Sequence, residues 1–257
     1  MILVTVTQTQ GSVPREAGTW MIVREHDTIG TMGGGNAEFQ ATAFARDLFK
    51  IGTPQATKRF ALGPSLGQCC GGVMDLSFER IDAAQLALLQ AKQKQALQPI
   101  ALFGGGHVGR AIVNVLATLP YCITWVDSRD EIFPENLPSN VICEHSDPVQ
   151  NAVADVEAGS AVLIMSFSHA EDLEIVQQCL ARNRASMARG AVADLPFIGL
   201  IGSKTKWATF QNRLRERGFT DAELAQVTSP IGVAGIAGKE PEVIAVAAAA
   251  QLLQLRA

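Results

Sequence analysis

One stretch, residues 100–119, constrains more than any other what this chain can fold into. An apolar run over 100–103 predicts a buried strand, and apolar residues at helical spacing over 108–119 predict a helix. Between them lies the order Gly104-x-Gly106-x-x-Gly109, which is typical of a dinucleotide-type phosphate loop. In such a loop Gly104 allows the tight turn, Gly106 lets a phosphate approach the backbone, and Gly109 lets the helix pack on the strand.

The residues around this loop complete a predicted phosphate site. The helix N-terminus, which includes His107, offers free N–H groups and a positive dipole end to an anion. A second apolar run over 122–126 ends in Asp127, 23 residues after Gly104, where a carboxylate can take ribose hydroxyls. The alternative is a strand–turn–helix that needs its glycines only for packing.

Strand and helix patterns alternate from residue 100 onward, which predicts a doubly wound parallel sheet with helices on both faces. Ligands bind such sheets beyond the carboxyl ends of the strands. Polar loops are expected there at 104–109, 127–129, 166–169 and 202–204. In these loops His169 either contacts a ligand or caps its own helix, and Ser203 belongs either to a further anion nest or to an N-cap.

The first part of the chain predicts a separate mixed α/β domain. A second glycine run, Gly33, Gly34 and Gly35, opens a helix over 37–49, and bare backbone N–H groups there suit an anion or a flat ring. The alternative is a tight strand-to-helix turn. Glu38 lies in the first helical turn, where stabilising the helix dipole is the alternative to a binding role. A polar stretch before Pro99 places the boundary between domains 1–96 and 97–257.

A third glycine-rich loop, 63–72, carries Gln68, Cys69 and Cys70. Two poorly shielded thiols are soft ligands for a metal or for sulfur. The loop has neither a C-x-x-C motif nor a nearby histidine pair, so structural zinc is excluded. Two small half-buried residues in a tight loop are the alternative.

The composition of the chain limits which binding partners and which cellular compartment are expected. A net charge of −4 gives no basis for a non-specific nucleic-acid or membrane surface. Five cysteines, two of them adjacent, fit reduced thiols in the cytoplasm better than a disulfide framework, and no secretory signal is evident. The most apolar segment, 243–253, is too short to span a bilayer. Residues 1–7 predict a strand that begins at the first residue, so either the true start lies further upstream or a partner covers the edge of this strand, which favours a homodimer.

Nearly the whole chain resembles one family, the xanthine dehydrogenase accessory proteins of the XdhC/CoxI type. In the first domain the resemblance rests on residues 5–15 (T-V-T-Q-T-Q-G-S-V-P-R), 30–35 with Glu38, and 68–72 (Q-C-C-G-G). In the second it rests on 103–109, 127–129, 168–169 with Asp172, 198–206 and 230–232. The ordered set is far more specific than any single motif.

The resemblance implies a maturation factor for molybdenum hydroxylases that binds molybdenum cofactor, protects it while a cysteine desulfurase-type sulfurase adds the terminal sulfur, and delivers it to a xanthine dehydrogenase-type enzyme. The cofactor is a pterin with a phosphate and a dithiolene. Glycine loops suit the phosphate, as does the fork of Arg15, which lies in one segment with Ser12. Glu38, Asp127 and Gln68 suit the pterin edge, and Cys69 and Cys70 suit the molybdenum–sulfur centre.

Two other readings stay open from the sequence. One is an NAD(P)-dependent oxidoreductase, which the first glycine loop and Asp127 favour, although His169 is the only good acid–base candidate. The other is a scaffold between sulfurase and hydroxylase in which both glycine loops are purely structural. The Rossmann-like domain is also compatible with a bound nucleotide.

Overall fold

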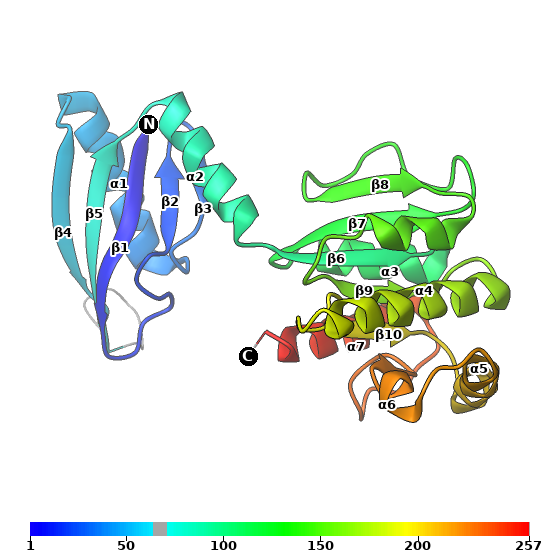
Figure 1. The fold of residues 1–257 in the computed structure, drawn as a ribbon. Coiled ribbons are helices and arrows are strands. Elements are labelled where there is room, and N and C mark those ends of the chain that lie inside the picture. Colours follow the sequence, from blue (N-terminus) through cyan, green and yellow to red (C-terminus); the bar gives the residue numbers. More distant parts are fainter. Residues whose placement is uncertain (64–70, 257) are drawn as a thin grey trace. The chain divides into compact units, whose positions relative to one another are not determined.

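The computed structural model describes residues 1–63 and 71–256, and the chain divides into two compact units, 1–92 and 93–257 (Figure 1). Each unit has its own sheet and its own apolar core. Together they confirm the predicted fold class: a mixed α/β unit followed by a doubly wound parallel-sheet unit.

The first unit is an antiparallel sheet with the strand order β3-β2-β1-β5-β4. Its strands and helices are β1 (Ile2–Gln10), β2 (Trp20–Val23), β3 (Thr28–Gly30), α1 (Gly35–Ile51), β4 (Gln55–Ala61), β5 (Val73–Arg80) and α2 (Ala83–Gln95). Alternate residues of β1 point into the core, starting with Ile2 and Val4, and α1 packs on them through alanines at helical spacing. Small side chains at 37, 41 and 45 let α1 approach the sheet closely.

The position of β1 corrects one expectation. β1 pairs with β2 on one side and with β5 on the other, so it is central and presents no open edge. The reasoning that favoured a homodimer from an unprotected first strand is therefore wrong, because that strand is covered by the unit's own later strands. The homodimer itself stays a prediction.

The second unit is a parallel sheet with the order β11-β10-β9-β6-β7-β8. Its elements are β6 (Gln98–Phe103), α3 (His107–Leu116), β7 (Tyr121–Asp127), β8 (Val141–His145), the 3-10 helix η2 (Val149–Ala154), β9 (Ala161–Ile164), α4 (His169–Ala188), β10 (Phe197–Leu200), α5 (Lys204–Glu216), α6 (Asp221–Leu224), β11 (Val227–Thr228) and α7 (Pro241–Gln254). The order reverses at β6, so the topological switch point lies between β6 and β9.

The two faces of β6 bury against different helices, which is what a doubly wound sheet requires. Ile100 and Leu102 join the core beneath α3 and α7, whereas Ala101 and Phe103 join the core beneath α4 and α5 (Figure 1). Strands buried on both faces read as continuous apolar runs, and this is why the sequence pattern located them.

Three short elements, η2, α6 and β11, were not predicted. The apolar segment 243–253 lies in α7, which buries only one face: Val246 and Leu253 are exposed.

Candidate functional site

The carboxyl ends of the parallel strands form one edge, and the predicted polar loops of the second unit lie along it. The loop after β6 lies at the switch point, with the loops after β7 and β9 on either side. The register in the sheet, Phe103 opposite both Val126 and Ile164, brings the three strand ends level.

The glycine loop has the geometry that its motif predicts. Gly104 adopts a positive φ of 127°, and a Cβ there would meet the carbonyl oxygen of Met165 at 2.0 Å. A Cβ on Gly109 would meet the Gly104 carbonyl oxygen at 1.9 Å, so α3 packs on the loop only because residue 109 is glycine. The indole Nε1 of Trp125 donates to that same carbonyl at 2.9 Å and fixes the turn.

The N-terminus of α3 is open to an anion. Gly106 is the N-cap residue, and no side chain caps the helix. A Cβ on Gly106 would meet nothing within 4 Å, and its φ of −68° is one that any residue adopts. His107, the first helical residue, is exposed. The first turn of α3 therefore has free N–H groups, the positive end of the helix dipole and space for an anionic ligand.

Asp127, at the end of β7, is held by its own chain. The carboxylate is 1% exposed, with Oδ2 accepting from the Gly105 N–H and from the Arg129 guanidinium, and Oδ1 accepting from the Arg129 N–H and Nε. Burial opposes ionisation, but the hydrogen bonds from Arg129 and Gly105 outweigh it and lower the pKa of Asp127 below its usual value.

Side chains from the β7 and β9 loops meet across the end of β6. The hydroxyl of Ser128 donates to Glu171 Oε1 at 2.7 Å, and the Arg129 guanidinium stacks 4.7 Å above the ring of Phe167. Glu171 Oε2 also accepts from the Phe167 N–H at 3.1 Å. We call these four residues, Ser128, Arg129, Phe167 and Glu171, the switch-point bridge.

A buried ion pair, between Asp172 and Lys206, lies at the same edge of the sheet. Asp172 accepts from the N–H and the hydroxyl of Ser166 and from Lys206 Nζ at 2.5 Å, and its side chain is 3% exposed. In the sequence, Asp172 is singled out only as one of the residues that carry the family resemblance. The structure shows that it joins the β9 loop to α5 as well.

Two predicted site residues have local roles at helix starts. Ser203 caps α5, its hydroxyl accepting from the Lys206 N–H at 3.1 Å. His169 is the exposed first residue of α4, and Ser168, not His169, supplies the cap. The binding roles of both residues stay predictions.

In the first unit, Glu38 organises the second glycine loop. A single oxygen, Oε2, accepts from Thr31 Oγ1, the Met32 N–H and the Gly34 N–H at 2.5, 2.8 and 3.0 Å. Burial opposes ionisation, but these hydrogen bonds and the charge of Arg15 lower the pKa of Glu38. The Gly33 N–H donates to Thr31 Oγ1 at 3.0 Å. Three amides, those of Met32, Gly33 and Gly34, are thus already engaged by side chains of the same segment.

The loop after β1 lies against both other glycine segments of this unit. A Cβ on Gly33 would meet Pro14 at 2.5 Å and Arg15 Cγ at 3.5 Å, and a Cβ on Gly72 would meet the Ser12 carbonyl oxygen at 2.3 Å. The structure therefore brings together Ser12, Arg15, the run of Gly33, Gly34 and Gly35 with Glu38, and the end of the thiol loop. Gln68, Cys69 and Cys70 themselves lie outside the described residues.

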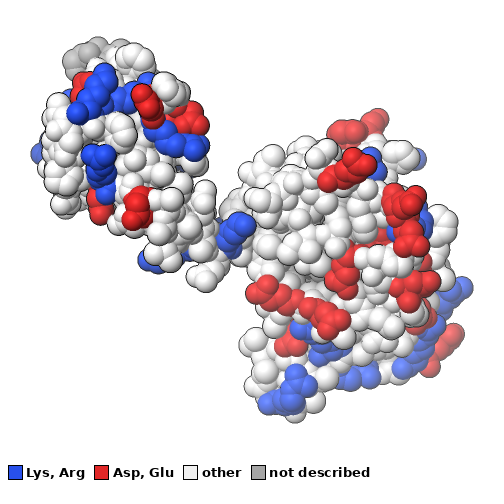
Figure 2. Space-filling model, turned by 90° about the horizontal axis from the view of Figure 1, so that it is seen from above, with Lys and Arg blue, Asp and Glu red and all other residues white. Residues whose placement is uncertain are grey.

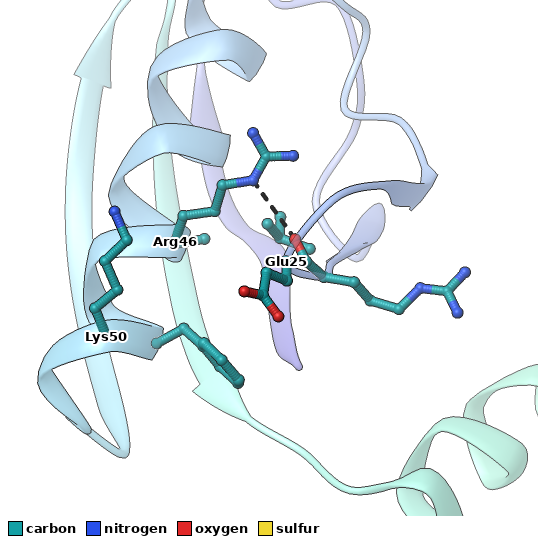
Figure 3. Close-up of a pocket in the computed structure, with 7 residues that line it drawn as sticks. Glu25, Arg46 and Lys50 are labelled. Atoms are coloured by element: carbon teal, nitrogen blue, oxygen red, sulfur yellow. Dashed lines mark hydrogen bonds between the residues drawn. The ribbon is translucent and has the colours of Figure 1, made fainter.

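A separate hollow of about 390 Å³ lies between α1 and the β2–β3 turn (Figure 3). Arg46 and Lys50 come from α1, and Glu25 comes from the turn; Arg46 Nε donates to the Arg24 carbonyl oxygen at 3.5 Å. It contains none of the predicted site residues.

The sequence missed Arg129, Glu171 and Lys206 as site residues. Arg129 lies two residues after Asp127, which ends a strand, and this spacing is compatible with an ion pair between the two side chains. Glu171 and Lys206 gave no usable signal, because each meets its partner only through the tertiary fold.

Two family models match the chain. Residues 100–252 match the XdhC Rossmann domain, and residues 1–61 match the XdhC and CoxI family. The chain belongs to the XdhC family. Both halves of the predicted resemblance are thereby confirmed.

Individual relatives of this XdhC-family chain are distant. An Escherichia coli K12 protein described as uncharacterized protein YqeB is 23% identical over 256 residues, which is 98% of this chain and 42% of that protein. The chain thus spans less than half the length of that relative. A solved structure described as a xanthine dehydrogenase from Bacillus halodurans is 18% identical with a TM-score of 0.78, covering 99% of this chain and 91% of the other. At this identity the likeness concerns the fold.

A Shigella flexneri protein described as a Rossmann-fold NAD(P)-binding family protein is 14% identical with a TM-score of 0.37, over 60% of this chain and 85% of that chain.

Two further observations concern the charged side chains at the surface and the length of the helices. Acidic and basic side chains lie interspersed on the visible face of each unit (Figure 2). Over residues 1–63 and 71–256, no helix has the length and apolar character needed to cross a membrane.

Proposed function

We propose that this protein acts in the maturation of a xanthine dehydrogenase-type hydroxylase, by binding molybdenum cofactor, protecting it during sulfuration and delivering it. Membership of the XdhC family supports a role in xanthine dehydrogenase maturation. The cofactor is cargo here, and a cysteine desulfurase-type sulfurase and the hydroxylase are the proposed partners. A homodimer and a cytoplasmic location are part of the same proposal.

One observation carries the binding step: the uncapped N-terminus of α3 with free space beside Gly106. A phosphate is a dianion with several acceptor oxygens, so it matches free N–H groups at the positive end of a helix dipole. The other glycine loop is less suitable, because the amides of Gly33 and Gly34 already donate to Thr31 and Glu38. We therefore assign the pterin phosphate to Gly104, Gly106, His107 and Gly109.

The thiols of Cys69 and Cys70 have a separate proposed role in the first unit. They are soft donors suited to a molybdenum–sulfur centre, and Ser12, Arg15 and Gln68 would flank them with polar groups. Substituting Cys69→Ser and Cys70→Ser should lower retention of sulfurated cofactor. Unchanged retention would remove the thiols from the proposal.

The decisive experiment concerns Gly106. Gly106→Ala places a methyl group where the phosphate approaches, while its φ of −68° and its open surroundings leave the fold intact. We expect cofactor affinity to fall at least about tenfold, because charge-assisted hydrogen bonds of about 1.5–3 kcal/mol weaken. The measurement is retention of molybdenum and pterin by the full chain after incubation with released cofactor and desalting.

Asn114→Ala is the control, since Asn114 is an exposed residue of the same helix, more than one turn beyond the glycine loop. Equal retention by wild type and Gly106→Ala would refute the phosphate assignment. A wild-type protein that retains no pterin yet captures the hydroxylase would replace the carrier function with that of a scaffold.

A further inference from the structure

The switch-point bridge lies where a dinucleotide would run. In a sheet of this strand order a dinucleotide crosses the carboxyl edge, its pyrophosphate at the first helix N-terminus and one ribose on the acid at the end of the second strand. Here the first strand is β6 and the second is β7, so the corresponding acid is Asp127.

The ribose position is closed by Arg129. Both carboxylate oxygens of Asp127 accept hydrogen bonds from the chain, and the side chain is 1% exposed. Ribose hydroxyls would have to displace the Arg129 guanidinium, which would leave the buried charge of Asp127 without its partner.

The crossing itself is closed by the contacts between the two neighbouring loops. β7 and β9 both border β6, so the Ser128–Glu171 hydrogen bond and the Arg129–Phe167 stack span the end of β6. Arg129 takes part in both closures, because it holds Asp127 and covers Phe167.

We infer that the switch-point bridge makes this Rossmann crevice selective, excluding a dinucleotide laid across the sheet edge and admitting only a ligand that offers one phosphoryl group to α3. The inference rests on the proposed function for the admitted ligand. Ser128, Arg129, Phe167 and Glu171 are its specificity-determining residues. The bound nucleotide with which the Rossmann-like sequence pattern is compatible would then be unable to lie across this edge of the sheet.

The test is a fluorescence titration of the full chain with NADH. Wild type should show no saturable binding. The double variant Ser128→Ala/Arg129→Ala should bind NADH saturably, with a midpoint at least about tenfold below the highest concentration at which wild type stays unsaturated, since it opens the crossing and frees Asp127 from Arg129. A second double variant, Arg129→Gln/Glu171→Ala, removes the charge that holds Asp127 and the acceptor of the Ser128 hydroxyl while keeping a polar side chain beside Asp127, so it covers the case in which the first fails to fold.

Arg184→Ala is the matched control. Arg184 also combines an ion pair, with Glu223, and a stack at 4.4 Å on an aromatic ring, that of Phe219, but away from the strand ends. It should behave as wild type. Saturable NADH binding to wild type, or no gain in either folded double variant, would overturn the inference.

The same samples separate this inference from the proposed function. A wild type that retains pterin and also binds NADH keeps the carrier function and refutes the selectivity. A wild type that retains neither, while the double variants gain NADH binding, keeps the selectivity and refutes the carrier function.

Discussion

At the residue scale, the place of Asp127 in the sequence and its surroundings in the structure indicate different roles for its carboxylate. Its place at a strand end suggested a ligand contact, whereas its hydrogen bonds tie the glycine loop to Arg129. An ionised group with 1% exposure is stable only because every acceptor site has a donor. Asp172 follows the same rule with Lys206 and Ser166.

Asp127→Asn should lower the free energy of unfolding by about 2 kcal/mol at neutral pH, because it removes the charged acceptor of Arg129. The pKa of Asp127 is lowered in the folded state, so its contribution is complete above the ordinary value of 3.8 and is lost as pH falls through the folded pKa. Urea unfolding of both proteins across acidic pH should show the difference shrinking only below that value. A difference independent of pH would contradict this account.

At the element scale, the β6–α3 junction contains two glycines that differ in whether the structure has room for a side chain there. Gly109 touches the loop backbone, and Gly106 faces open space. Packing therefore requires glycine at position 109 and not at position 106, where the binding role stays a prediction.

Gly109→Ala should destabilise the second unit by about 1–3 kcal/mol, since its Cβ would lie 1.9 Å from the Gly104 carbonyl oxygen and α3 would have to shift. Gly106→Ala should change stability by less than about 0.5 kcal/mol. Urea unfolding of the two variants beside wild type measures the contrast, and equal losses would show that the loop does not pack as described.

At the scale of the whole molecule, the two units have separate cores: one apolar cluster belongs to residues 1–92, and two others belong to residues 93–257. Cys179 lies wholly within the second unit, where burial raises the pKa of its thiol to about 12. A buried thiol of this kind does not react until its surroundings open.

Residues 97–257 should therefore fold alone, with a cooperative thermal transition matching one transition of the full chain. Cys179 should resist a thiol reagent below that transition and react above it, in the fragment and in the full chain alike. Mass spectrometry of labelled peptides reports this directly. Labelling of Cys179 in the folded fragment, or a fragment without a cooperative transition, would show that the second unit depends on the first.

The sequence by itself determined the fold class, the family and the first glycine loop. Strands buried on both faces and glycines at fixed spacing leave a local pattern, which is readable without knowing any contact. Only the tertiary structure decided that β1 is central, that Glu38 engages the amides of the second glycine loop, and that Arg129 and Glu171 meet residues from other loops. The central place of β1 and the contacts of Arg129 and Glu171 depend on segments distant along the chain being brought together, which local patterns do not record. Glu38 contacts residues only four to seven positions away, but its hydrogen bonds to those amides depend on the conformation of the folded loop.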